Sequence, residues 1–204
     1  MTQIPTQQHF KEAYSGEAPW DIGRIQSAFA AIADQVKSPV LDAGCGTGDM
    51  ALYLASKGQQ VTGLDFLEEP IRRARAKAAE RNLKVDFRVA DATKLADLPD
   101  RFNTVVDSGL FHVFTDDDRR KYVAGLAHVL HPGGRVFLMC FSNEEPGQFG
   151  PRRVTREELQ TAFGTGWQIE SIEPNHFEIN PKFKGATFSE GGPKTWFVVA
   201  RRAP

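Results

Sequence analysis

An apolar strand runs directly into a glycine-rich loop at residues 40–48, where the sequence reads VLDAGCGTG. Glycines in such a loop let the backbone approach a ligand closely, and the free N–H groups at the start of the following helix favour a negatively charged group. The spacing is G-x-G-x-G, whereas a dinucleotide fingerprint requires G-x-G-x-x-G. The carboxylate of Asp42, just before the loop, would repel a pyrophosphate and attract an ammonium group.

A second carboxylate, Asp65, ends the next expected strand. An acid at this place can accept hydrogen bonds from both hydroxyls of a ribose. Taken with Asp42 and the glycine spacing, it favours an amino-acid-bearing nucleoside as ligand over a dinucleotide.

The rest of the chain alternates short apolar runs with longer amphipathic stretches, which predicts βαβ units on a mostly parallel sheet. The expected strands are residues 40–42, 60–64, 85–89, 102–106, 135–141, 167–172 and 195–201. Helices are expected over 22–36, from the glycine loop to Gly58, from Pro70 to about Asn82, after the cap at Thr115, and after the capping box that starts at Thr155. A turn is expected at 131–134, and a loop of about twenty residues separates the last two strands, a length typical of functional or mobile segments.

Charge and cysteine content narrow the function classes. The 25 Lys and Arg residues against 26 Asp and Glu give a net charge of −1, without the basic excess typical of nucleic-acid binders. We interpret arginine groups near 72–75 and 152–156 as solvated charge.

Two cysteines, Cys45 and Cys140, are too few for a disulfide framework and indicate a reducing compartment. The start of the chain lacks a signal-peptide pattern, and the longest apolar run, at 136–141, is too short to span a bilayer, so we expect a cytoplasmic protein without a membrane span. The pattern favours no particular oligomeric state.

Four motifs in this order resemble those of class I S-adenosylmethionine-dependent methyltransferases. They are LDAGCGTG at 41–48, GLDF at 63–66, ADA at 90–92 and VVDSG at 105–109, and the resemblance covers about residues 40–141. It implies a Rossmann-like, doubly wound α/β fold whose seven-stranded sheet is parallel except for an antiparallel last strand. It also implies S-adenosyl-L-methionine as cofactor and S-adenosyl-L-homocysteine as product.

The same resemblance implies cofactor contacts. The loop glycines would face the methionine part, Asp65 would hold the ribose, and Asp91 would meet the adenine amino group. The full set of expected cofactor-binding residues is Trp20, Asp42, Gly44, Cys45, Gly46, Gly48, Asp65, Phe66, Asp91, Ala92, Asp107 and Ser108. It further implies one domain over 1–204, with an N-terminal arm and helix (1–37), a cofactor-binding core (38–142) and C-terminal strands (143–204) that carry a substrate-side loop at 174–194.

Two further segments resemble small-molecule methyltransferases. PWDIG at 19–23 is similar to the PWxxG entry segment of thiol, thiopurine and halide types, and DSGLFH at 107–112 is most similar to bacterial heterocyclic toxin methyltransferases. In those families the entry segment closes over the cofactor, so Trp20 would lie near the sulfonium, because an aromatic face attracts positive charge. The alternative is that Trp20 only fastens the N-terminal helix to the sheet.

Methyl transfer from a sulfonium needs alignment and exclusion of water more than strong acid or base groups. His112 follows the fourth expected strand, and we expect it to orient the nucleophile or to take its proton, unless it only packs under the next helix. Asp107 is the second candidate catalytic residue. The expected acceptor-binding residues are Tyr14, Phe111, His112, Phe149 and Phe183. No Cys and His grouping has zinc spacing, so no metal is expected.

Phenylalanine is unusually frequent, with 15 Phe against 3 Tyr and 3 Trp. Eight of these rings fall outside the expected strands and helix faces, and we interpret them as the wall and lid of an apolar site: Phe10, Phe66, Phe111, Phe114, Phe149, Phe177, Phe183 and Phe188. We therefore expect methyl transfer to an oxygen, sulfur or nitrogen atom of a small aromatic or heterocyclic molecule, or to an aromatic or thiol acceptor more generally. The alternatives are a methyltransferase of protein or RNA, an NAD-linked oxidoreductase, and a noncatalytic nucleotide-binding protein.

Overall fold

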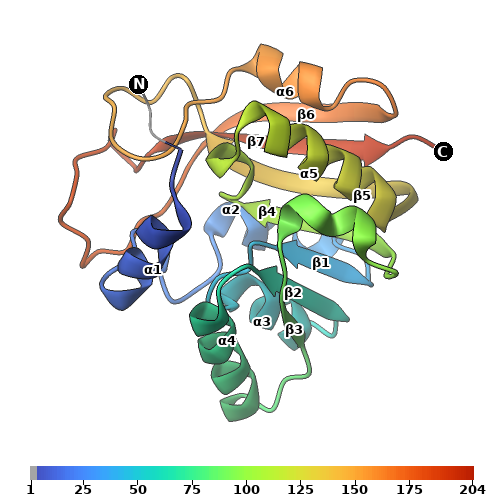
Figure 1. Cartoon of the computed structure of the whole chain (residues 1–204), viewed down its shortest axis with the longest axis horizontal. Helices are drawn as coiled ribbons and strands as arrows, with labels where there is room; N and C mark the ends of the chain where they lie inside the picture. Colours follow the sequence, from blue (N-terminus) through green and yellow to red (C-terminus); the bar gives the residue numbers. More distant parts are fainter. Residues whose placement is uncertain (1–3) are drawn as a thin grey trace.

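A single sheet of seven strands organises the computed structural model, which describes residues 4–204. The strand order is β3-β2-β1-β4-β5-β7-β6. The strands are β1 (Val40–Ala43), β2 (Val61–Asp65), β3 (Asp86–Val89), β4 (Phe102–Ser108), β5 (Leu130–Phe141), β6 (Trp167–His176) and β7 (Lys194–Arg202). Strands β1 to β5 pair in parallel, and β7 is antiparallel to both of its neighbours, β5 and β6. The expected α/β sheet with an antiparallel last strand is confirmed (Figure 1).

Helices cover both faces of this sheet. They are α1 (Gln7–Ser15), α2 (Ser27–Ala31), α3 (Asp49–Ser56), α4 (Glu68–Glu80), α5 (Asp116–Val129) and α6 (Arg156–Ala162), with short 3-10 turns η1 (Ala33–Gln35), η2 (Ala92–Asp97) and η3 (Phe111–Val113). One core cluster joins the sheet to η2, α5 and α6, and a second joins the opposite face to α2, α3 and α4. Two covered faces explain why the inner strand β1 is buried at all four positions.

The helix starts follow the capping chemistry in the sequence. The Thr155 hydroxyl accepts a hydrogen bond from the Glu158 N–H, and the Glu158 carboxylate accepts one from the Thr155 N–H, which forms the expected capping box. The Thr115 hydroxyl likewise accepts from the Asp118 N–H at the start of α5. No helix within residues 4–204 has the length and apolar character needed to cross a bilayer.

The helix expected over 22–36 is wrong over its first part. Only α2 and the turn η1 are helical, and Gly23 has a left-handed φ of 72°. The Ser27 N–H donates to the Glu178 carboxylate, so a distant loop satisfies the first donor of α2 and fixes where this helix begins.

The turn expected at 131–134 lies within the bounds of β5. Leu130 pairs with Phe102 and the regular register resumes where Arg135 pairs with Thr104, so the residues between them form an irregularity in the ladder. Gly133 takes a φ of 78° there, which a glycine adopts readily.

Segments from both ends of the chain meet where the parallel strands end. Figure 1 shows α1 and the loop at 177–193, between β6 and β7, at the same end of the sheet. Residues 1–3 of the expected N-terminal arm lie outside the described residues. In an open parallel sheet this edge is the usual place for a ligand site.

The packing around Gly48 gives a stability prediction. A Cβ atom at Gly48 would lie 2.7 Å from Phe87 and 2.8 Å from Ala74, and its φ is +84°. Gly58 has the same φ of +84° but nothing within 4 Å. We expect Gly58→Ala to cost about 1 kcal/mol of unfolding free energy from backbone strain, and Gly48→Ala to cost roughly 1–3 kcal/mol more from overpacking. Urea unfolding of both variants checks this, and equal losses would contradict the packing argument.

Candidate active site

The glycine loop is tied to the end of the neighbouring strand. Gly44, Gly46 and Gly48 have φ values of 72°, 53° and 84°. The Cys45 N–H donates to the Leu64 carbonyl at 2.8 Å, and the Gly46 N–H donates to Asp65 Oδ2 at 3.1 Å. A Cβ atom at Gly46 would lie 2.8 Å from the Tyr14 hydroxyl, whereas one at Gly48 would point into the packing between α4 and β3. Gly46 therefore faces the candidate cofactor site, whereas Gly48 is required for packing between α4 and β3.

Three buried aspartates lie at the ends of three adjacent strands, β2, β1 and β4. Backbone N–H groups bind each one: Asp42 accepts from Ala51 at 3.1 Å, Asp65 accepts from Gly46 and Leu67, and Asp107 accepts from Leu110 at 2.7 Å. Burial raises the pKa of Asp42 to about 8, of Asp65 to about 6 and of Asp107 to about 7. The charge at this edge of the sheet therefore changes with pH near neutrality.

The structure contradicts two of the expected acceptor-side roles. Asp107 is fully buried, and its second oxygen accepts the Tyr122 hydroxyl at 2.9 Å, so it shapes the turn into η3 and has no oxygen facing an acceptor. Phe111 is also fully buried and stacks on Phe163 with ring centroids 6.0 Å apart, so its ring belongs to the core. Asp107 lies inside β4, one residue past the expected strand end at Val106, and the turn after β4 directs the Phe111 ring into the core.

Residues suited to a ribose and an adenine come together at the ends of β2 and β3. The Ala90 N–H donates to the Asp65 carbonyl at 2.9 Å, which places Asp91 and the buried Ala92 beside β2. Asp91 Oδ1 accepts from the Thr93 N–H and hydroxyl. Phe66 is half-buried and meets Phe10 of α1 edge-on at 5.5 Å. Ser108, at the end of β4, is partly exposed.

Helix α1 and the segment after it cover the glycine loop. The Trp20 Nε1–H donates to the Tyr14 hydroxyl at 3.1 Å, and the Phe10 ring lies 5.6 Å from Trp20. Arg73 of α4 donates to the Tyr14 carbonyl at 2.8 Å. Burial and the nearby Asp65 raise the pKa of the Tyr14 phenol far above its usual range, so this hydroxyl stays neutral.

The entry segment is fastened to the glycine loop by a chain of polar contacts that no local sequence pattern predicts. Lys77 Nζ donates to the Thr47 hydroxyl at 2.8 Å, and this hydroxyl donates to Asp21 Oδ1 at 2.9 Å. Lys77 also pairs with Asp49 at 3.0 Å. The only available signal was Asp21 itself, inside the PWDIG segment, because its partner lies far along the chain.

The loop at 177–193 is bound to the same entry segment. The buried Asn180 donates from its backbone N–H to the Pro19 carbonyl at 2.8 Å and from its side chain to Glu17 at 3.0 Å. Glu178 pairs with Arg24 at 2.7 Å, and its backbone exchanges two hydrogen bonds with the Gln26 amide. Two segments more than 150 residues apart thus form one cover over the sheet edge.

A group of phenylalanines, here called the aromatic wall, extends from His112, which contacts two of its rings, Phe141 and Phe177. It consists of Phe141, Phe149, Phe177, Phe183 and Phe188, whose rings contact one another at centroid distances of 5.6–6.3 Å. Phe177 and Phe188 also line a cleft of about 400 Å³. Phe149 and Phe183 therefore lie together as expected, whereas Phe114 packs on Tyr122 in the core.

His112 is buried at the base of this wall. Its Nδ1 atom accepts a hydrogen bond from the Phe141 N–H at 3.0 Å, and its ring meets Phe141 edge-on at 5.2 Å. Burial, with Arg119 and Arg153 nearby, lowers the pKa of His112 to about 3, so the imidazole is neutral at physiological pH. A Cβ atom at Gly109 would lie 3.6 Å from His112 Nε2, and one at Gly44 would touch Leu110, which places this histidine along the same edge as the glycine loop.

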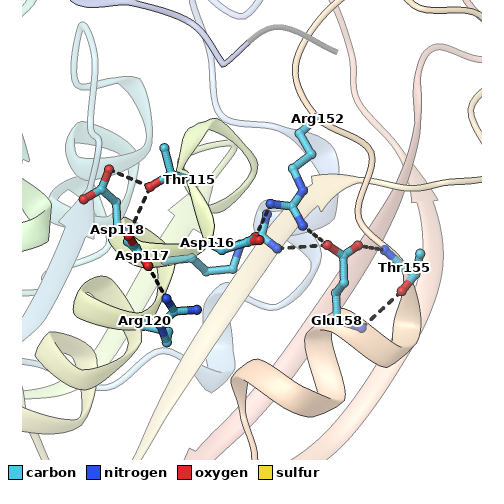
Figure 2. A network of polar contacts seen from close by, with 9 residues as sticks. Thr115, Asp116, Asp117, Asp118, Arg120, Arg152, Thr155 and Glu158 are labelled. Carbon is cyan, nitrogen blue, oxygen red and sulfur yellow. Dashed lines mark hydrogen bonds and ion pairs between the residues drawn. The ribbon is translucent and has the colours of Figure 1, made fainter. Parts of the chain in front are cut away.

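Both arginine groups noted in the sequence are engaged within the fold. Figure 2 shows Arg152 between Asp116 and Glu158, where it joins the first turns of α5 and α6. In the other group, Arg75 donates to the Phe87 carbonyl at 2.7 Å, and Arg72 pairs with Glu69. The interpretation as solvated charge therefore holds for Arg72, whose side chain is 65% exposed, and is wrong for Arg152, which is 25% exposed.

Comparisons with known proteins agree with this geometry. Residues 40–134 match a family model described as a methyltransferase domain. The chain is 34% identical over 199 residues to the 2-heptyl-1-hydroxyquinolin-4(1H)-one methyltransferase of Mycobacteroides abscessus, which covers 91% of this chain and 86% of that protein. A solved structure concerned with conversion of a disulfide bond into a thioacetal group during echinomycin biosynthesis has a TM-score of 0.84 at 33% identity and covers 97% of this chain and 93% of its own. The 1,6-didemethyltoxoflavin-N1-methyltransferase of Burkholderia thailandensis shares the fold, with a TM-score of 0.70 at 23% identity and coverage of 97% and 84%.

The depressed pKa of His112 predicts how stability depends on pH. The folded value of about 3 lies below the ordinary 6.5, so the unfolded chain binds the extra proton between these values and stability falls as pH drops below 6.5. Between pH 7 and pH 5, the wild type should lose about 2 kcal/mol more unfolding free energy than His112→Asn. Urea unfolding at both pH values measures this. His128→Asn, at an exposed position on α5, should follow the wild type, and a His112→Asn curve parallel to the wild type would contradict the assignment.

Proposed function

The chain belongs to the class I S-adenosylmethionine-dependent methyltransferases, and from this premise we propose that it methylates a small heteroaromatic molecule at an oxygen, sulfur or nitrogen atom. The observation that carries the proposal is the aromatic wall beside His112. Its buried rings, Phe141 and Phe177, contact this histidine, and its other rings, the exposed Phe149 and the half-buried Phe183 and Phe188, offer apolar surface. The substrate in the name of the 34% identical relative, an N-hydroxyquinolone, is a heteroaromatic molecule with such an oxygen atom.

The described residues fit the cofactor. Gly46 leaves room at the end of β1, and each Asp65 oxygen accepts one backbone N–H, so each keeps a lone pair for a ribose hydroxyl. Asp91 and Phe66 would meet the adenine ring, and Trp20, held by Tyr14, would lie near the methionine part. When bound, S-adenosylmethionine supplies a methyl group on a positively charged sulfur, which an edge rich in carboxylates favours.

The protein's own contribution is alignment and exclusion of water. The entry segment and the loop at 177–193 are hydrogen-bonded to each other through Asn180, so they close over the cofactor and acceptor together. The rings of the wall would fix the plane of an aromatic acceptor, and His112 would orient its reactive atom.

A methyltransferase of protein or RNA is the main competitor. An extended polymer requires an open, charged surface, whereas Arg152 is largely buried between Asp116 and Glu158, and the exposed Arg72 pairs with Glu69. The cover over the sheet edge also favours a guest small enough to be enclosed. Both observations support a small-molecule acceptor.

Methyl transfer from isotopically labelled S-adenosylmethionine tests the proposal. The acceptor panel should hold phenols, heteroaromatic thiols, ring nitrogens and 2-heptyl-1-hydroxyquinolin-4(1H)-one, with a total RNA fraction and denatured protein as macromolecular acceptors. Mass spectrometry should identify a methylated heteroaromatic product. Label found only in RNA or protein would contradict the proposal.

A matched pair of variants controls this experiment. Asp65→Asn should weaken calorimetric affinity for S-adenosylmethionine roughly 10- to 100-fold, because it removes a charge-assisted acceptor of two hydroxyls. Asp117→Asn, at an exposed position on α5, should leave the affinity unchanged.

A further inference from the structure

Building on the proposed function, we propose that the acceptor is bound and methylated as its anion, and that neutral His112 donates its Nε2–H to that anion rather than taking a proton from the acceptor. This narrows the substrate class to heteroaromatic compounds whose hydroxyl or thiol is acidic enough to ionise in solution near neutral pH. The protein then selects the ionised form and supplies no base.

The hydrogen bond at Nδ1 fixes the role of the histidine. A neutral imidazole carries one proton, and the nitrogen without it is the acceptor. His112 Nδ1 accepts the Phe141 N–H at 3.0 Å, so the single proton sits on Nε2. Nε2 is therefore a donor, and within residues 4–204 it has no hydrogen-bond partner of its own. A general base would need a free lone pair at this atom, which the tautomer does not provide.

The charged groups around His112 also favour an anion. Arg153 lies over the Phe141 ring at 4.8 Å and is held there by the carbonyls of Glu145, Pro151 and Phe149. On the α5 side, Arg119 is buried against Phe111 at 4.4 Å. Its Nε and Nη2 atoms have no hydrogen-bond partner in the described part of the chain, so its charge is only partly compensated by Glu158 at 3.4 Å.

The carboxylates on the elements packed around His112 are already engaged. Glu145 accepts from the backbone N–H groups of Ser189 and Lys194, at 3.2 and 2.8 Å. Glu158 accepts from the Thr155 N–H and pairs with Arg152, and Asp107 is bound behind the sheet edge. Hydrogen bonds from N–H groups and from Arg152 therefore already occupy these three carboxylates, which favours loss of the acceptor's proton before it binds.

The transfer step balances without an enzyme-borne base. The acceptor loses its proton to solvent, and a lone pair of the resulting oxyanion or thiolate forms the bond to the methyl carbon. The carbon–sulfur bond breaks with its electron pair going to sulfur, which becomes the neutral thioether of S-adenosylhomocysteine. The Nε2–H of His112 stays on the ring throughout, because it orients the anion by a hydrogen bond.

A series of ring-substituted 1-hydroxyquinolin-4(1H)-ones and thiophenols, whose pKa values range from about 5 to 9, tests the inference. The rate of methylation of each compound is measured as a function of pH. The midpoint of kcat/KM against pH should move with the pKa of each acceptor. A single midpoint common to all acceptors would overturn the inference, since it would report a base on the protein. If the wild type methylates none of these compounds, it is the proposed function that fails.

Two variants and a proton count complete the test. A glutamine amide donates a hydrogen bond but takes no proton, so His112→Gln should keep at least about a third of kcat/KM, whereas His112→Phe should lose about 100-fold, mainly in KM. Equal, large losses in two well-folded variants would point to a base on the protein.

Calorimetry of the wild type in two buffers of different ionisation enthalpy counts the protons released on binding. With a probe acceptor whose pKa lies one unit above the pH, about one proton should be released. Binding without proton release would contradict the inference, whatever the variants do.

Discussion

Hydrogen bonds from backbone N–H groups to three buried aspartates shape the sheet edge on which the candidate site depends. Within residues 4–204 these aspartates have no ion-pair partner. Asp42, Asp65 and Asp107 are each 7% exposed or less. The Ala51 N–H of α3 donates to Asp42, and N–H groups of Leu67 and Leu110, just after β2 and β4, donate to Asp65 and Asp107. Such burial raises the energy of the charged form, as their raised pKa values show. A positively charged ligand at this edge offsets that cost, so the turns that shape the site also favour the charge of the methyl donor.

The cover over this edge depends on the same loop. Thr47 lies within the glycine loop, and its hydroxyl joins Lys77 to Asp21 of the entry segment. Asn180 then joins the entry segment to the loop before β7. Because these contacts are in series, displacement of the entry segment would loosen the loop at 177–193 that carries part of the aromatic wall. In the proposed function, cofactor and acceptor share this one cover, which suits a reaction that must exclude water.

Much of the fold could be predicted because local signals agree with tertiary structure. The glycine loop, the aspartates at strand ends and the capping box at Thr155 are each specified by a few adjacent residues. The first turns of the helix expected at 22–36 fail because Glu178, 151 residues away from Ser27, decides where α2 begins. The places of Asp107 and Phe111 differ from expectation because β4 continues past Val106 to Ser108 and the turn after it directs Phe111 into the core. Asn180 and Lys77 carried no local signal, since their partners are remote in sequence.

The negative character of the edge is tested most directly by comparing affinities for S-adenosylmethionine and S-adenosylhomocysteine from pH 5 to pH 8.5 by calorimetry. The two ligands share their ribose, adenine and amino acid, but only the first carries a charged sulfur. As Asp65, Asp107 and Asp42 ionise, at pKa values of about 6, 7 and 8, the ratio of the two affinities should rise in favour of S-adenosylmethionine. A ratio that stays constant over this range would contradict the view that these carboxylates hold the methyl donor by its charge.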